Sequence, residues 1–216
     1  MKYKKFAMVV LFLFSLLTFL NFYNLKCQGF QSLEGKFLEN YKDVERTLIV
    51  EGKSYLNNQD FKDLIKNKMN SEFYGEKSLE ENTTSFSYKI LNELDDIQVD
   101  VYNDEENSFR IIYSTKNKKE NLEEVKKNIN HLLEEVSYDV RYFKELKGRI
   151  DIQGDLEEVL DKELKAVGIK SYTSLKINNG YTGKAELANS TINFAICTYE
   201  KNSYMVIGEP LIVSTY

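Results

Sequence analysis

The chain has 216 residues, with 34 acidic and 29 basic side chains and a formal net charge of −5. Four of the lysines and none of the acidic residues precede residue 27, so residues 27–216 carry 25 basic against 34 acidic side chains. Such an acidic remainder repels the phosphate backbone of nucleic acids, and two cysteines are too few for a disulfide-stapled scaffold.

An uninterrupted apolar segment from Phe6 to Leu25 follows the basic start of the chain. Its length is close to the ~20 residues that cross a bilayer core as a helix. The lysines before it predict a cytoplasmic N-terminus and an extracytoplasmic remainder. Because no small residue stands at the usual cleavage spacing, residues 1–26 are predicted to be a retained signal anchor. The alternative is a cleaved signal peptide, which would make the protein secreted.

Residues 27–45 are predicted to be a juxtamembrane segment with a short helix at 32–41. Residues 46–141 are predicted to form a first α+β half. It starts with a strand from Thr47 past Gly52, and Asp60 then caps a helix. Residues 71–82 are polar and are predicted to be a loop. Three alternating strands and a long linking helix complete this half, with predicted ranges 85–90, 97–102, 109–114 and 118–138.

Residues 142–216 are predicted to repeat this order of elements as a second α+β half. A strand at 141–152 is interrupted at Gly148 and is followed by a helix with a capping box of Asp155 and Glu158. Three strands are predicted at 172–177, 186–199 and 204–213. Pro210, the only proline, is predicted at a bulge or an edge.

The fold class predicted from this pattern is α+β. The two halves, each of strand, helix and three strands, are expected to pair into one curved antiparallel sheet with helices on one face. Cys197 lies in an apolar strand pattern and Cys27 at the membrane edge, so two free thiols are favoured and a bridge between them is left open.

The chain resembles the YwmB-type family of exported proteins from spore-forming Gram-positive bacteria. The resemblance rests on the N-terminal anchor, the doubled element order, the turn Asn179-Gly180-Tyr181-Thr182-Gly183 and the stretch at 207–212. This family is labelled TATA-box-binding for its fold, so the resemblance implies a saddle-like α+β fold and no catalytic residue.

Nucleic-acid binding, which that fold would invite, is a remote alternative. A TATA-binding protein reads DNA with a concave sheet rich in Lys, Arg and Asn, together with inserted phenylalanines. Here the strands alternate aromatic and aliphatic residues with Ser, Asp, Gln and Asn, and basic residues cluster on the predicted helices. An exported acidic domain would also never meet the chromosome, so no nucleic-acid partner is predicted.

The residues offer few candidates for metal binding or catalysis. His131, the only histidine, precedes Glu134 and Glu135 on the long helix, but zinc sites need more nitrogen or sulfur ligands, so a solvated surface is predicted. A second acidic group could hold Ca²⁺ but lacks the spacing of a calcium loop, and is predicted to be a hairpin turn. Its members are Asp100, Asn103, Asp104, Glu105 and Glu106.

Paired carboxylates need only converge in space, so a site formed by Asp100, Asp151 and Glu186 on the concave face of the sheet is an alternative hypothesis. No nucleophile elbow, phosphate loop or dinucleotide fingerprint is present. We therefore predict no catalytic, cofactor-binding or metal residue, and no cofactor.

The function predicted is that of a non-enzymatic, membrane-tethered interaction module of the cell envelope, with a role in wall growth or sporulation as a further hypothesis. The expected partners are the membrane and an envelope protein. Tyrosines suit protein interfaces as well as sheet packing, and several lie in the second half. These are Tyr172, Tyr181, Tyr199, Tyr204 and Tyr216. An extracytoplasmic ligand-binding or carboxylate-based hydrolytic domain is the alternative, and the oligomeric state is left open.

Overall fold

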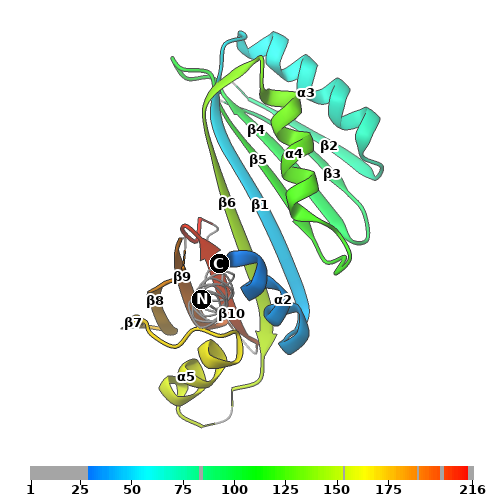
Figure 1. Cartoon of the computed structure of the whole chain (residues 1–216). Helices are drawn as coiled ribbons and strands as arrows, with labels where there is room; N and C mark the ends of the chain where they lie inside the picture. The colour runs from blue at the N-terminus through cyan, green and yellow to red at the C-terminus, as the bar shows by residue number, and fades with distance from the viewer. Residues whose placement is uncertain (1–28, 83–84, 153, 189, 200–201, 214–216) are drawn as a thin grey trace, which may run out of the picture.

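The computed structural model describes residues 29–82, 85–152, 154–188, 190–199 and 202–213. Over these ranges it contains four helices and one open antiparallel sheet of ten strands, which confirms the predicted α+β class (Figure 1). The helices are α2 (Phe30–Asn40), α3 (Asn58–Glu72), α4 (Leu122–Leu133) and α5 (Leu156–Ala166). The predicted anchor lies outside these ranges. Of the helices that are described, none is long and apolar enough to cross a membrane.

The strand order of the sheet is β2-β3-β4-β5-β1-β6-β10-β9-β8-β7. The first half contributes β1 (Lys42–Ser54), β2 (Glu76–Glu81), β3 (Ser85–Leu91), β4 (Asp95–Tyr102) and β5 (Ser108–Thr115). The second half contributes β6 (Ser137–Ile150), β7 (Thr173–Ile177), β8 (Gly180–Glu186), β9 (Thr191–Tyr199) and β10 (Asn202–Glu209). The two longest strands, β1 and β6, pair at the centre and join the halves.

Each half has four strands after its helix, so the predicted count of three is wrong. The missing strand of the first half is β2, which lies in the segment predicted to be a loop. All six of its side chains are exposed, so it carries no apolar alternation to identify it. In the second half, the single strand predicted at 186–199 begins at Thr191, and the additional strand β8 ends at Glu186.

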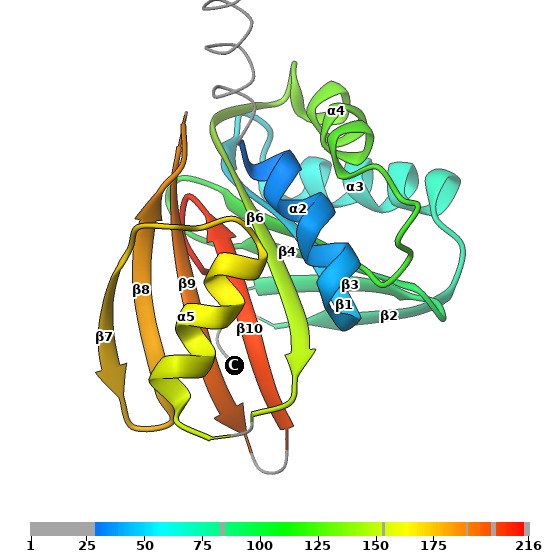
Figure 2. The same cartoon turned by 60° about the horizontal axis from the view of Figure 1, so that its bottom comes forward.

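All four described helices pack on the same face of the sheet, as the apolar pattern predicts. On β1, Leu48 and Val50 point to this face and join the first-half core with α3 and α4. The second-half core gathers α2 and α5 over β6, β8, β9 and β10. Figure 2 shows the twist that turns the two halves away from each other. We call the opposite face, on which no described helix lies, the helix-free face.

Several helices begin or end at other residues than the sequence predicts. Helix α3 is capped by Asn57, whose side chain accepts a hydrogen bond from the N–H of Asp60, so Asp60 lies in the first turn. Asp155 occupies the cap position of α5 but makes no side-chain cap bond. Helix α4 ends at Leu133, and β6 begins at Ser137, four residues before the predicted strand.

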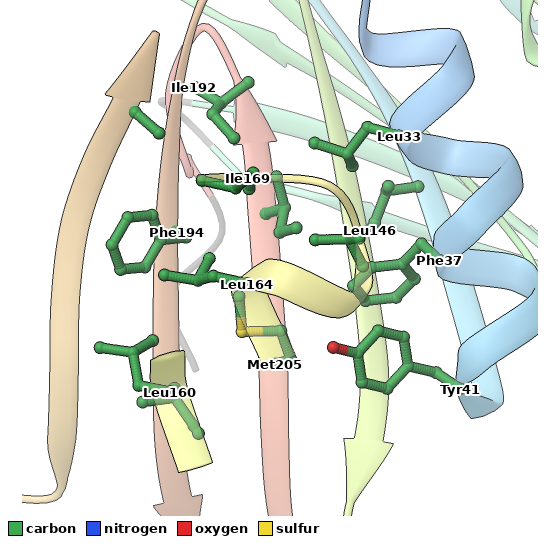
Figure 3. Packing of buried hydrophobic residues seen from close by; sticks show 14 of the residues in the cluster. Leu33, Phe37, Tyr41, Leu146, Leu160, Leu164, Ile169, Ile192, Phe194 and Met205 are labelled. Carbon is green, nitrogen blue, oxygen red and sulfur yellow. The ribbon is translucent and has the colours of Figure 1, made fainter. Parts of the chain in front are cut away.

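Helix α2 packs at the junction of the two halves. It buries Phe30, Leu33 and Phe37 in the second-half core, beside side chains from α5 and β6 (Figure 3). Strand β6 runs without a break through Gly148, where the sequence predicted an interruption. A Cβ at this glycine would lie 2.9 Å from the Phe37 ring and 2.8 Å from Tyr41 Cβ. The glycine therefore allows α2 to lie close against the sheet.

An ion pair fixes the same helix to the first half. Arg46 on β1 is buried, and its Nη1 lies 2.8 Å from the Glu34 carboxylate on α2. Its Nη2 donates a 2.5 Å hydrogen bond to the carbonyl of Asn117, between β5 and α4. One guanidinium thus connects three separate parts of the chain.

The chain after β10 turns back across the helix-free face. The N–H of Val213 donates a 2.5 Å hydrogen bond to the carboxylate of Glu145, a buried residue on β6. Gly208 pairs with Glu145 across the β10–β6 ladder. Pro210 follows the end of β10 at an interior strand, so the edge position considered for it is wrong. We call residues 210–213 the C-terminal strap.

We predict that Gly208→Val lowers the free energy of unfolding by about 1–3 kcal/mol, because a side chain there collides with backbone and overpacks the site. A Cβ at Gly208 would lie 2.3 Å from the carbonyl oxygen of Leu211 in the strap. Urea denaturation of the full chain measures the loss. Gly35→Ala is the control, since nothing lies within 4 Å of a Cβ there. A Gly208→Val chain as stable as the wild type would show that the strap does not rest on this glycine.

Candidate functional site

The predicted metal-site candidates lie on open surface. His131 is 89% exposed in its side chain, and its Nδ1 is 3.9 Å from the Glu134 carboxylate. Within the described ranges, no three His, Cys, Asp or Glu side chains gather closely enough to hold a metal ion. The geometry around His131 is that of a solvated helix surface.

The acidic group after β4 forms a turn. The side chain of Asp104 accepts hydrogen bonds from the backbone N–H groups of Glu106 and Ser108, at 3.2 and 3.0 Å. Partial burial opposes ionisation, but these hydrogen bonds lower the pKa of the Asp104 carboxyl below its usual value. Asp100 is separate from this turn and lies on the helix-free face, where the side-chain amide of Gln98 donates to its carboxylate.

The three carboxylates proposed for a catalytic site do not come together. Asp100 is on β4 and Glu186 ends β8, six strand positions away in the sheet, which is about 29 Å at the usual strand spacing. Asp151 follows the end of β6 and is exposed. That hypothesis is therefore wrong for these residues. Alternation in the sequence predicts the face on which a side chain lies but not its lateral position.

Cys197, Tyr172 and Tyr181 are packing residues, whereas Tyr216 lies outside the described residues. Cys197 is buried on β9, and burial raises the pKa of its thiol, so it is not poised as a nucleophile. Cys27 lies outside the described residues. Tyr172 and Tyr181 pack against the second-half core, and Lys147 lies over the Tyr204 ring at 4.8 Å from its centroid.

A cavity of about 630 Å³ opens on the helix-free face, where β1, β4, β5 and β6 approach one another. Its walls are mainly polar and charged, with glycine, valine and phenylalanine among them. It is lined by Glu51, Gly52, Lys53, Tyr102, Ser108, Phe109, Arg110, Asp139, Val140 and Arg141. We call it the arginine cavity. Its volume falls in the range of small-molecule and peptide-anchor pockets.

Strand register places two guanidinium groups around one carboxylate in this cavity. Glu51 on β1 pairs with Arg110 on β5 and with Arg141 on β6. Arg110 Nε lies 3.6 Å from one oxygen of Glu51, and Arg141 Nη2 lies 3.3 Å from the other. The Nε of Arg110 is buried without a hydrogen-bond partner among the described residues. Glu51 therefore meets neither guanidinium in a close two-point pair.

Lys53 and Tyr102 line the cavity, and the Tyr138 ring lies beside it, with its centroid 6.0 Å from Lys53 Nζ. Lys53 Nζ is 2.6 Å from Glu106 and 3.7 Å from Asp139, and its hydrogen bond to Glu106 raises its pKa. The ring of Tyr138 is stacked on that of Tyr55, with centroids 4.8 Å apart. Tyr102 is 38% exposed. Burial, with the Asp100 carboxylate nearby, raises the Tyr102 pKa, so its hydroxyl keeps the proton it can donate.

Reasoning from the sequence missed the residues of the arginine cavity. Arg110 could be assigned to the polar side of its strand from the alternation of residues 109–114. Its neighbours could not, because Glu51 and Arg141 are distant in sequence and become adjacent only through the β1–β5 and β1–β6 registers.

The comparisons with protein-family models and with curated proteins found no match for this chain. The resemblance to the YwmB-type family therefore stays a prediction from the residues. The interpretation of the site rests on its geometry: an open polar sheet face with aromatic side chains and a cavity that carries two arginines.

Proposed function

We propose that the chain is an exported, membrane-tethered, non-enzymatic protein of the cell envelope that binds an envelope protein through its helix-free face. The observation that carries this proposal is the position of the described helices, all on one face of the sheet. Within the described residues, the other face is left to strand side chains and the C-terminal strap. A role in wall growth or sporulation is part of the same hypothesis.

The character of the helix-free face supports a protein partner. In the first half, serine, glutamine and tyrosine alternate with charged residues along β3, β4 and β5, and most of these side chains are half-buried or exposed. Such a mixture of polar and aromatic groups is typical of interfaces that form and separate in water. Leu175 and Ile177 on β7 add exposed apolar surface at one edge of the sheet.

We further infer that the two halves are a duplicated unit of the TATA-binding type. The support is the order of elements: a long strand, a helix and four strands, with β1 and β6 paired at the centre. The charge pattern still argues against DNA as the partner. Glu51, Asp96 and Asp100 lie among Lys89 and Arg110 on the same face, whereas a DNA-binding surface is strongly basic.

Two measurements in intact cells test the proposal. A reporter fused after the last residue is expected outside the membrane. A photo-crosslinking residue placed at Lys89, exposed on the helix-free face, is expected to capture an envelope protein. The same residue placed at Lys127, exposed on α4, serves as the matched control and is expected to capture much less. An internal reporter would overturn the proposed location, and equal capture from both positions would overturn the proposed binding face.

A further inference from the structure

We propose that the arginine cavity binds a carboxylate group of the partner, either a peptide chain end or an acidic side chain, between Arg110 and Arg141. This inference rests on the proposed function, because it identifies the chemistry that the helix-free face recognises. It names a binding site formed by β1, β5 and β6 near the end of their shared ladder.

Arg110 and Arg141 carry more N–H donors than their contacts with Glu51 use. Each guanidinium presents five N–H donors in a rigid fork that matches the two oxygens of a carboxylate. Glu51 takes one contact from each arginine, at 3.6 and 3.3 Å, and neither contact is a close two-point pair. The buried Nε of Arg110 is left without a hydrogen-bond partner among the described residues, which is costly for a charged group. The Arg110 side chain as a whole is 25% exposed, so a second carboxylate would accept hydrogen bonds from its remaining N–H groups.

The net charge of the arginine cavity suits a ligand with one negative charge. Three cations and two carboxylates line the cavity and leave one positive charge, which suits a single monoanion. The lysine among them, Lys53, is held at the rim by Glu106 and Asp139, so the two arginines are the cations that face a ligand. Arg141 is 71% exposed in its side chain, so it can turn toward a ligand at little cost.

The remaining walls supply neutral donors and room. The hydroxyl groups of Tyr102 and Ser108 line the same cavity, and Tyr102 keeps its proton. Gly52 contributes no side chain to the wall. The volume of about 630 Å³ accommodates the last residues of a peptide as well as its carboxylate. The tyrosines at the rim provide flat surface for the groups that follow it.

The experiment uses the full chain in detergent micelles, with arginine Nε–H resonances followed by NMR. The probes are an N-acetylated alanine tripeptide with a free carboxylate, the same peptide as its C-terminal amide, an amide peptide that carries one aspartate, and inorganic phosphate. We expect the first to shift the Arg110 and Arg141 signals in a saturable manner and the plain amide to leave them unchanged. The aspartate peptide separates a side-chain carboxylate from a chain end, and binding by either supports the proposal.

Three variants make the test specific. Arg110→Lys removes the fork but keeps the charge, and is expected to weaken binding of the free-acid peptide about tenfold or more. Arg141→Lys, at a more exposed position, tests the same point with less risk to folding. Arg149→Lys is the control, because that arginine lies on the same face but pairs with Asp43 away from the cavity.

Equal binding of the plain amide and the free acid, or tighter binding of phosphate than of the free acid, would overturn the carboxylate assignment. Unchanged binding in both Arg110→Lys and Arg141→Lys would overturn the location. If these results occur while photo-crosslinking from Lys89 persists, only this inference fails and the proposed function stands. Loss of face-specific crosslinking would instead count against the proposed function itself.

Discussion

Replacing Glu34 with leucine is expected to lower the free energy of unfolding by about 3–5 kcal/mol, because it leaves the Arg46 guanidinium buried without its counter-ion. The side chains of Arg46 and Glu34 are only 4% and 15% exposed. After the change, the hydrogen bond to the Asn117 carbonyl remains as a neutral partner of the buried charge. Urea denaturation of the full chain, followed by circular dichroism, measures the loss.

Two companion variants give this prediction its specificity. Glu39→Leu makes the same chemical change at an exposed position of α2 and is expected to alter stability by no more than about 0.5 kcal/mol. The double variant Glu34→Leu with Arg46→Met removes both charges, and is expected to recover most of the loss. A loss in the single variant of under about 1 kcal/mol would contradict the view that this pair fastens α2 to the first half.

The second large effect is expected in the second-half core, where Phe194→Ala should cost about 3–5 kcal/mol through the cavity it leaves. Phe194 is fully buried on β9 (Figure 3). Its ring meets the Tyr172 ring edge to face, with centroids 5.6 Å apart. A Cβ at Gly183 on β8 would lie 2.4 Å from the same ring, which shows how closely the strand surface fits it.

Leu175→Ala is the matched control for this variant, since Leu175 is 69% exposed on β7. It should change stability by no more than about 0.5 kcal/mol. Native-state hydrogen exchange adds a second measurement. Because the two cores are separate clusters, amides of β9 and β10 should lose more protection than those of β3 and β4. A loss below about 2 kcal/mol would mean that the site collapses around the missing ring.

The sequence predicted those elements whose apolar spacing determines their packing. Helix α4 carries Leu122, Val125 and Ile129 on one buried stripe, and β5 alternates buried and half-buried side chains along its length. The strand β2 could not be found in this way because it packs no side chain against the core. The strand β8 contains two glycines and a weak pattern, so the sequence predicts no strand over 180–185 and begins the next one at Glu186.

The candidate site was the least predictable part of the molecule. Its main residues, Glu51, Arg110 and Arg141, belong to three strands that are brought together by register. A shift of one residue in either ladder would move a whole strand's side chains to the opposite face. Register depends on the packing of the entire sheet, so a single sequence carries no local mark of it. The isolated His131, by contrast, could be correctly judged from its own surroundings.

Helix α2 packs near the centre of the sheet, and this limits how far the proposed tethered protein can lie from the membrane. If the apolar segment ends at Leu25, only residues 26–29 separate the bilayer from the first buried residue of α2. Four extended residues span at most about 14 Å. A domain joined to the membrane by so short a segment stays close to the membrane surface. If the anchor is retained as proposed, the partner would have to come to the outer surface of the membrane.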